Sequence, residues 1–138
     1  MGLRYLDSCI AIYAVEESGL FGDDVRTQLA TTPDHILISP LVMLESLVHP
    51  LRTNDRVLIE TYRSFFAALP LVDLGADAYL RAAELRAEFG LRTPDALHVA
   101  SAELAGCTAF WTNDKRLASP LRAAGINLIL PSPPGAPL

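Results

Sequence analysis

Cysteine, lysine and long apolar runs are scarce in this sequence. The two cysteines, Cys9 and Cys107, form no CxxC pair and are too few for a disulfide framework, which favours a reducing compartment. No apolar run approaches the roughly 18 residues of a membrane span, and Arg4, Asp7 and Glu16 interrupt any secretory apolar region near the N-terminus. These absences predict a soluble, cytoplasmic protein without a membrane segment.

Signature motifs of several enzyme classes are also absent. The chain has no GxSxG elbow, no Gly-rich phosphate-binding loop and no GxGxxG after its first predicted strand. It also shows no set of histidines and cysteines for zinc, so zinc is a poor candidate. A hydrolytic reaction in this protein would therefore proceed without a protein nucleophile of these kinds.

The composition indicates one folded, acidic domain. The chain has 138 residues, of which 51% are hydrophobic, and its mean hydropathy is +0.29, so it can bury a sizeable core and still leave apolar surface for a partner. The net charge of −5 and the pI of about 5.0 argue against nucleic-acid binding by bulk charge. Ten of the eleven basic residues are arginine, which suits local phosphate contacts.

The pattern of apolar and turn residues predicts strands that alternate with helices. The expected strands cover residues 3–7, 35–39, 69–74, 109–112 and 126–130, and the expected helices cover residues 8–17, 21–30, 41–49, 56–69, 77–89, 92–106 and 115–124. This alternation predicts a three-layer α/β/α sandwich with a mostly parallel central sheet. We expect a single domain over residues 1–130 and a flexible Pro/Gly-rich tail over residues 131–138.

Prolines and a glycine mark several helix boundaries. Ser39 and Thr93 each precede a proline, and both suit an N-cap followed by proline at the first helical position. Pro50 is expected to end the helix that begins after Ser39, and Gly90 is expected to end the helix before Thr93.

Four acids occupy positions that a purely structural role explains poorly. Asp7 ends the first predicted strand and Asp114 closely follows a late one, so both are expected at the carboxyl edge of the sheet, where sites collect. Glu45 lies within an apolar helix, and Asp95 lies in the first turn of another. Each alone could cap a helix, pair with an arginine or complement a helix dipole. Together, the four acids favour a shared site.

Four neighbouring carboxylates would repel one another unless a cation neutralises them. Mg²⁺ and Mn²⁺ prefer carboxylate and water oxygens, and such a site suits phosphodiester hydrolysis by metal-activated water. The hydroxyls of Ser8 and Thr112 stand close to acids in the sequence and could orient a carboxylate or a metal-bound water. The sequence therefore predicts a Mg²⁺ or Mn²⁺ site with the four acids as its metal ligands and catalytic residues.

Four segments together resemble the PIN-domain family, and most closely its VapC-like toxins of toxin–antitoxin modules. The segments are YLDSCIAIYAVEE, LVMLESLVHP, RTPDALHVASA and FWTNDKRL, in the family's order and spacing along nearly the whole chain. The resemblance implies an α/β/α sandwich and a Mg²⁺- or Mn²⁺-dependent endoribonuclease. It also implies a structured RNA substrate such as a tRNA or rRNA loop, an antitoxin partner and a homodimer. The family's four acids fall on Asp7, Glu45, Asp95 and Asp114, and its small polar positions fall on Ser8 and Thr112.

Two positions depart from the family pattern. Cys9 stands where many members carry Ser or Asn, which puts one hydrogen bond to the site in question. Arg116 stands where some members carry a further acid, which would weaken a second metal site.

Several other polar residues flank the acids. His98 follows Asp95 by one helical turn and is expected to orient that carboxylate or simply to pack. Arg92, Lys115 and Arg116 could contact the RNA backbone, or they could be ordinary solvated charges.

Three other functions stay open. A phosphoacceptor signalling domain also has clustered acids on an α/β fold, but its paired acids after the first strand and its lysine at the end of a late strand are missing here. A catalytically inactive PIN-like binding module would keep the fold without binding metal, although all four acids are present. A PIN-family RNA-processing nuclease outside a toxin system would carry the same residues, and the neighbouring gene would separate it from a toxin.

Overall fold

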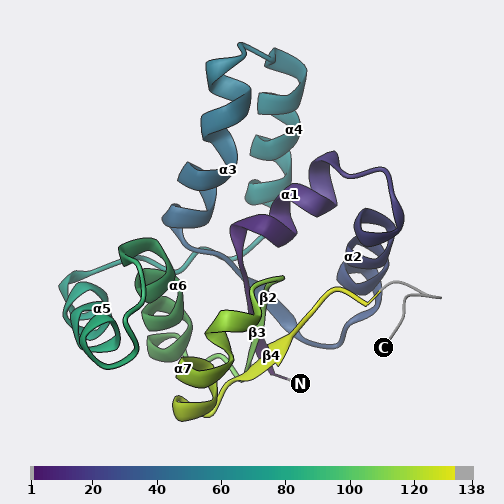
Figure 1. Cartoon of the computed structure of the whole chain (residues 1–138). Helices are drawn as coiled ribbons and strands as arrows, with labels where there is room; N and C mark the ends of the chain where they lie inside the picture. Colours follow the sequence, from purple (N-terminus) through teal and green to yellow (C-terminus); the bar gives the residue numbers. More distant parts are fainter. Residues whose placement is uncertain (1, 133–138) are drawn as a thin grey trace.

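Four parallel strands and seven α-helices make up the computed structural model, which describes residues 2–132 (Figure 1). The strands are β1 (Leu3–Leu6), β2 (His35–Leu37), β3 (Ala109–Trp111) and β4 (Asn127–Ile129). The helices are α1 (Ser8–Glu16), α2 (Leu20–Thr31), α3 (Pro40–Arg52), α4 (Arg56–Ala67), α5 (Ala76–Phe89), α6 (Thr93–Leu104) and α7 (Ala118–Ala123), with a 3₁₀-helix η1 (Lys115–Leu117) before α7. The predicted three-layer α/β/α sandwich with a parallel sheet is confirmed.

The central strands of the sheet are buried on both faces. The strand order is β2-β1-β3-β4, and each neighbouring pair is parallel. Tyr5 and Leu6 on β1 and Phe110 and Trp111 on β3 are all 0% exposed, which explains why apolar runs rather than alternation encode these strands. Helices α1 to α4 form one contacting group and α5 contacts both α6 and α7, and Figure 1 shows the strands between the two groups.

The connections between the strands lead to opposite sides of β1. The chain passes from β1 outward to β2 and later returns to the opposite side of β1, where it forms β3 and then β4. The carboxyl ends of β1 and β3 therefore lie at a topological switch point, the place where open α/β sheets hold their ligands. Asp7 directly follows β1, and Thr112 directly follows β3.

The strand expected over residues 69–74 is wrong. This segment makes one isolated parallel bridge between Leu71 and Ile38. The Ile38 N–H donates to the carbonyl of Pro70 (3.1 Å), and the Val72 N–H donates to the carbonyl of Ile38 (2.7 Å). Pro70 has no N–H to add to a ladder, and the neighbouring strand β2 is short, so the pairing does not extend further.

Two helix boundaries also differ from expectation. Helix α3 continues past Pro50 instead of ending there. Proline keeps a helical φ, and the helix closes a further turn after it, since the Thr53 N–H donates to the carbonyl of His49 (3.0 Å). Arg92, and not Thr93, is the N-cap of α6, and Thr93 is the first helical residue.

Large apolar side chains remain exposed on helices α3 to α6. They are Leu44, Val48 and Leu51 on α3, Val57 on α4, Tyr79 and Leu80 on α5, and Leu104 on α6. Part of the apolar surplus in the composition therefore lies on the surface of the described chain.

No helix within residues 2–132 is long and apolar enough to cross a membrane. The chain leaves β4 beside α2, where the backbone N–H of Ser132 donates to Asp24 (3.0 Å) (Figure 1). Most of the predicted tail, residues 133–138, lies outside the described residues.

Candidate metal centre

Asp7 lies at the carboxyl edge of the sheet, and both of its carboxylate oxygens are held. Its backbone N–H donates to the carbonyl of Trp111 (3.0 Å), which continues the pairing of β1 with β3. Its side chain caps α1, because Oδ1 accepts a hydrogen bond from the Ser8 N–H (2.8 Å). Oδ2 accepts a hydrogen bond from the hydroxyl of Thr112 (2.8 Å), which is fully buried. These bonds fix the direction of the carboxylate.

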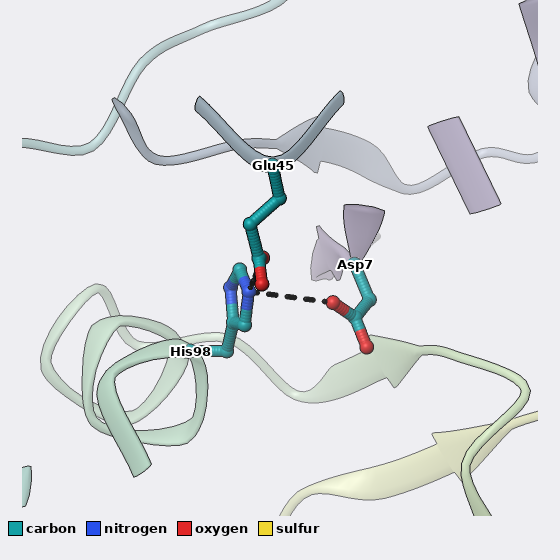
Figure 2. Close-up of side chains that lie close together, drawn as sticks. All are labelled: Asp7, Glu45 and His98. Carbon is teal, nitrogen blue, oxygen red and sulfur yellow. Dashed lines mark hydrogen bonds and ion pairs between the residues drawn. The ribbon is translucent and has the colours of Figure 1, made fainter. Parts of the chain in front are cut away.

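Glu45 and His98 reach Asp7 from two different helices, α3 and α6. The Nε2 atom of His98 contacts Oε1 of Glu45 and lies 3.5 Å from Oδ1 of Asp7 (Figure 2). One possible ligand atom from each of the three residues lies within 4.8 Å of the other two. The side chain of His98 is 2% exposed and that of Glu45 is 30% exposed, so solvent reaches the group from the side of Glu45.

A buried hydrogen-bond chain holds the other ring nitrogen of His98. Its Nδ1 lies 2.7 Å from the hydroxyl of Tyr5, and that hydroxyl lies 2.7 Å from the hydroxyl of Ser39. Ser39 is the N-cap of α3 but makes no capping hydrogen bond with its side chain, so its hydroxyl serves Tyr5 instead.

The tautomer of His98 decides what its Nε2 atom can do. If Nδ1–H donates to Tyr5, Nε2 carries a lone pair that can bind a metal. If Tyr5 donates to Nδ1, the Nε2–H donates to Glu45 and orients that carboxylate. The hydrogen-bond chain through Tyr5 orients the imidazole ring in both cases.

The surroundings of Glu45 favour its charged form. Burial acts to raise the pKa of Glu45, but the hydrogen bond and charge of His98, a hydrogen bond from Ser8 and the charge of Arg92 together lower it. Glu45 is therefore available as an anionic ligand at neutral pH.

Cys9 supports the site despite its departure from the family pattern. Its Sγ atom lies 3.6 Å from the hydroxyl of Thr112 and accepts a hydrogen bond from the Asn113 N–H (3.5 Å). Burial and the neighbouring charge of Asp7 raise the pKa of Cys9 to about 11, so the thiol stays neutral. Cys9 thus packs behind Thr112, whose hydroxyl holds Asp7.

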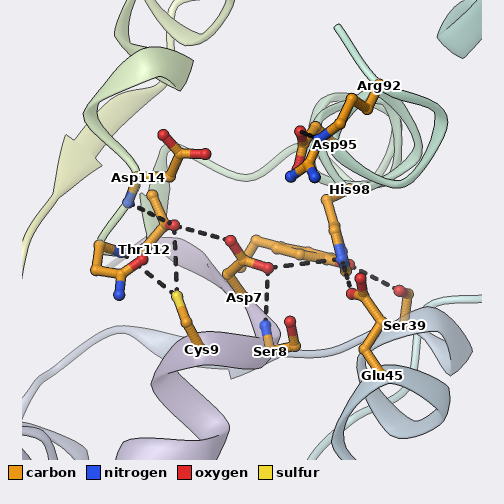
Figure 3. Close-up of polar contacts among 12 residues, drawn as sticks. Asp7, Ser8, Cys9, Ser39, Glu45, Arg92, Asp95, His98, Thr112 and Asp114 are labelled. Carbon is orange, nitrogen blue, oxygen red and sulfur yellow. Dashed lines mark hydrogen bonds and ion pairs between the residues drawn. The ribbon is translucent and has the colours of Figure 1, made fainter.

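The third and fourth acids lie beside this group, and each is paired with an arginine. Asp95 accepts a hydrogen bond from Nε of Arg92 (3.1 Å), and Asp114 accepts two from the guanidinium of Arg116 (2.9 and 2.6 Å). Arg116 also lies 3.9 Å from Asp95, so one guanidinium connects both acids. Figure 3 shows Asp95 paired with Arg92, and Asp114 beside Thr112. Hydrogen bonds from Arg116 hold the pKa of Asp114 below its usual range, although burial acts in the opposite direction.

Asp114 is both a helix cap and a neighbour of the site. Its side chain accepts a hydrogen bond from the Arg116 N–H (3.0 Å) at the start of η1. Its own N–H donates to the hydroxyl of Thr112 (3.1 Å), which in turn donates to Asp7. Within residues 2–132, however, the group of converging ligand atoms includes neither Asp114 nor Asp95.

One expectation about the side chains of the site needs correction. His98 does not orient Asp95, because its ring points inward to Glu45, Asp7 and Tyr5, whereas Asp95 stays near the surface and pairs with an arginine. Folding places this histidine beside two acids, Asp7 and Glu45.

The structure also reveals supporting residues that the sequence did not indicate. Tyr5 belongs to an apolar strand pattern, and Ser39 has the features of an ordinary N-cap, so neither carries a local signal of a site. Lys115, expected near the acids, is exposed and makes no ion pair with any residue in the described range 2–132.

The donor set of Asp7, Glu45 and His98 fits a divalent cation. Carboxylate oxygens suit Mg²⁺ and Mn²⁺, and an imidazole nitrogen suits first-row transition metals, so the mixed set is well suited to Mn²⁺ and compatible with Mg²⁺ that keeps several waters. Within residues 2–132, this is the one group of three or more histidine, cysteine, aspartate or glutamate side chains whose possible ligand atoms lie within 4.8 Å of one another.

Comparisons with known proteins agree with this fold. The family model for the PIN domain matches residues 4–120. No curated protein matches the sequence. The structure is similar to that of VapBC2 from Rickettsia felis bound to a promoter DNA fragment, with a TM-score of 0.75, 19% identity, and coverage of 93% of this chain and 98% of that chain.

Two further solved structures have the same fold. A toxin–antitoxin complex from Klebsiella pneumoniae gives a TM-score of 0.75 at 20% identity and covers 94% of this chain and 98% of that chain. VapC20 from Mycobacterium tuberculosis, a Sarcin-Ricin loop cleaving toxin, gives a TM-score of 0.73 at 13% identity and covers 85% of this chain and 94% of that chain.

Proposed function

The chain belongs to the PIN domain family, and from this premise we propose that it is a metal-dependent endoribonuclease and the toxin of a VapBC-type toxin–antitoxin module. The observation that carries the proposal is the convergence of Asp7, Glu45 and His98 where β1 and β3 end. This position is the expected ligand site of an open α/β sheet, and the donor set suits a divalent cation.

The structural relatives support the toxin role. Two of them are toxin–antitoxin complexes, and a third is a toxin that cleaves the Sarcin-Ricin loop. By analogy, this chain would act in the cytoplasm on a structured RNA, such as a tRNA or rRNA loop, and would be held inactive by a cognate antitoxin. The exposed apolar residues on helices α3 to α6 supply surface for the antitoxin or for a second copy of the chain in a homodimer.

Asp7, Glu45 and His98 would hold the cation, which would be Mg²⁺ or Mn²⁺. When bound, such an ion activates water and neutralises charge on the phosphate. The chain's own contribution is to fix its donors: Thr112 and the Ser8 N–H hold the two oxygens of Asp7 in place. Tyr5 orients the ring of His98, and Nε2 can bind the cation when Nδ1–H donates to Tyr5.

Asp95 and Asp114 would act around this centre, as ligands to bound water or to a second ion. Their partners Arg92 and Arg116 have side chains that are 71% and 68% exposed. Both arginines can therefore turn from the acids to RNA phosphates at little cost, because exposed ion pairs contribute little stability. Lys115 would supply a third contact to the substrate.

Cleavage of total cellular RNA tests the proposed activity. We expect discrete fragments with Mg²⁺ or Mn²⁺ and none with EDTA. The substitutions Asp7→Asn and Glu45→Gln should each lower the rate by about a hundredfold or more, because each removes a charge that holds the cation. Glu60→Gln, on an exposed acid of α4, is the matched control and should cleave like the wild type.

Thermal unfolding with Mn²⁺ separates metal binding from catalysis. A cation at about 100 times its dissociation constant stabilises the folded state by about 2.7 kcal/mol, and this gain should disappear in Asp7→Asn. Metal binding without RNA cleavage would point to another phosphodiester substrate, and no metal binding would favour an inactive PIN-like module. Cleavage that survives both site substitutions would contradict the proposal.

The genomic neighbour distinguishes a toxin from an RNA-processing nuclease of the same family. An adjacent small gene for a DNA-binding protein with an amphipathic C-terminus would support the toxin role. Co-expression of that protein should abolish cleavage, and the absence of any such gene would favour the processing role.

A further inference from the structure

A cavity of about 410 Å³ lies beside the acids and is not used by the metal group. Tyr13 of α1 and Phe21 of α2 line it on one side, and Asn113, Lys115 and the segment 130–132 complete it. Its volume is within the range of about 300–1,000 Å³ that is common for small-molecule sites.

The cavity and the metal group share one edge of the sheet. Asn113 and Lys115 follow β3, and the segment 130–132 follows β4, so the cavity is built at the carboxyl ends of the strands. Asn113 stands between Thr112, which donates to Asp7, and Asp114. A ligand in the cavity would therefore lie next to any phosphodiester held at the acids.

Two aromatic rings form one wall of the cavity. The rings of Tyr13 and Phe21 are stacked, with centroids 6.0 Å apart and planes inclined by 23°. Phe21 is 46% exposed, so its ring remains accessible to a ligand in the cavity. Nδ2 of Asn113 donates to the hydroxyl of Tyr13 (2.8 Å), which fixes both side chains and leaves the amide oxygen of Asn113 to accept from a ligand.

Lys115 supplies a positive charge that pairs with no acid within residues 2–132. It is the one lysine of the chain. Arg92 and Arg116 nearby are paired with acids, whereas Lys115 makes no ion pair with residues 2–132. A lysine in this setting suits a phosphate, to which it contributes a mobile point charge.

The aromatic wall, the amide and the lysine lie beside the proposed hydrolytic centre, and together they match the parts of one nucleotide. We propose that this cavity binds a nucleotide of the RNA next to the cleaved bond, with its base against Tyr13 and Phe21, its edge read by Asn113 and its phosphate at Lys115. The proposal rests on the proposed nuclease function and gives that nuclease a base-dependent choice of cleavage site. Stacking holds any base, and the single amide adds a preference among bases.

Binding of the four nucleoside 5′-monophosphates in EDTA, followed by NMR of the ¹⁵N-labelled protein, tests the cavity without metal or cleavage. We expect shifts of the Asn113 side-chain amide and a preference for one base. Phe21→Ala should lower the affinity about fivefold or more, because the stacking partner is removed. Lys115→Gln should lower the affinity for the nucleotide but leave that for the matching nucleoside unchanged.

Two variants on the other helices serve as controls. Tyr79→Ala removes an exposed ring on α5, and Arg56→Gln removes an exposed cation at the start of α4. Both should bind nucleotides like the wild type. Equal binding in all variants, no response of Asn113, or binding of inorganic phosphate as tight as that of any nucleotide would overturn the proposal.

RNA cleavage separates this proposal from the proposed function. If the wild type cleaves RNA, Phe21→Ala and Lys115→Gln should raise KM, Asn113→Ala should change the bases flanking the cut, and all three should leave Mn²⁺ affinity unchanged. Unaltered KM in the first two variants and unaltered cut sites in the third would refute the cavity while the nuclease stands. If the wild type cleaves no RNA, the nuclease falls, and the NMR titration still decides whether the cavity binds a nucleotide.

Discussion

The two ring nitrogens of His98 divide its contacts between the site and the core. Nε2 faces Glu45 and Asp7, and Nδ1 faces the buried hydroxyl of Tyr5. Metal-binding histidines usually have their second nitrogen fixed in this way, because the partner sets both the tautomer and the direction of the ring. His98 is therefore a candidate metal ligand or a positioning residue for Glu45.

Substitution of His98 should weaken metal binding more than folding. His98→Ala is expected to lower Mn²⁺ affinity about 10–100-fold, and His98→Gln should restore part of it by donating again to Glu45. Isothermal titration calorimetry measures the affinity, and the melting temperature without metal reports folding. His49→Gln, on an exposed histidine of α3, is the control. A lower melting temperature with unchanged Mn²⁺ affinity would assign His98 a structural role alone.

Arg4 illustrates how a charged residue is accommodated inside the domain. It is 8% exposed, its guanidinium lies 5.1 Å from the ring of Trp111, and its Nη2 donates to Asp34 (3.0 Å) and to the hydroxyl of Thr32 (3.1 Å). The Gly2 N–H and Arg4 hold the pKa of Asp34 below its usual range, while burial opposes them. The charge of Asp34 thus stabilises the folded state by balancing a buried arginine.

Removal of that charge should destabilise the protein in a pH-dependent way. Asp34→Asn is expected to lower the free energy of unfolding by about 2 kcal/mol at neutral pH, because it leaves Arg4 buried without a counter-ion. Since the folded state lowers the pKa of Asp34, its contribution is complete above the unfolded pKa of about 3.9 and is lost as the pH falls through the lower folded value. The difference in unfolding free energy between wild type and Asp34→Asn, measured by urea unfolding, should therefore be smaller near pH 3 than at neutral pH.

Asp23→Asn provides the matched comparison for Asp34→Asn. Asp23 pairs with Arg26 at 2.6 Å, but its side chain is 65% exposed, so its loss should cost about 0.5 kcal/mol or less. A difference between wild type and Asp34→Asn that persists undiminished at low pH would mean that packing, and not charge, is responsible.

Helices α1 and α2 form a closely fitted unit that carries one wall of the nucleotide cavity. The guanidinium of Arg26 on α2 donates to the carbonyls of Ala14 (3.1 Å) and Glu17 (2.8 Å) and so closes the C-terminal end of α1. Gly22 lies at the contact, where an added Cβ would come within 2.0 Å of the Glu17 carbonyl oxygen. The backbone approach of the two helices requires glycine at this position.

Gly22→Ala should separate the two helices. The clash is with backbone, so we expect a loss of about 1–3 kcal/mol in the free energy of unfolding, measured by urea titration. Gly19→Ala is the control, because its Cβ would meet only the carboxylate of Glu17 (2.9 Å), which is the end of a flexible side chain. Equal stability of the two variants would contradict this account of the contact.

The protein has a net negative charge, although its proposed substrate, RNA, is also negatively charged. The net charge is −5, and part of it belongs to the acids of the site, which a bound cation would neutralise. The cations at the site are Arg92, Lys115 and Arg116, so binding should depend on shape and on few phosphate contacts.

Salt titration of RNA binding measures the number of those contacts. Three cations on a single-stranded segment predict a slope of about −2 for log K against log salt, measured by fluorescence anisotropy with the Asp7→Asn variant in Ca²⁺. Lys115→Gln should make the slope shallower by about 0.7. A slope steeper than about −4 would reveal a basic surface away from the site.

Several features of the fold follow from local sequence. Apolar runs in β1 and β3 predict buried strands, and Gly90 predicts the end of α5 because it adopts a left-handed φ of 69° there. Local signals gave wrong predictions where contacts between distant segments determine the structure. Residues 69–74 have the sequence pattern of a strand but pair with the sheet at one bridge position. Pro50 has the features of a helix end, but helix α3 continues past it to Arg52.

The sequence alone determined the fold class and marked four acids as candidates for a site, because periodicity, turn residues and charges in apolar surroundings are local properties of a chain. Tertiary structure alone decided which side chains meet. The packing of α3 and α6 against the end of β1 brings Glu45 and His98 to Asp7, while Asp95 and Asp114 take arginine partners. Tyr5 and the cavity beside Asn113 likewise depend on contacts between elements far apart in sequence, which no spacing along the chain encodes.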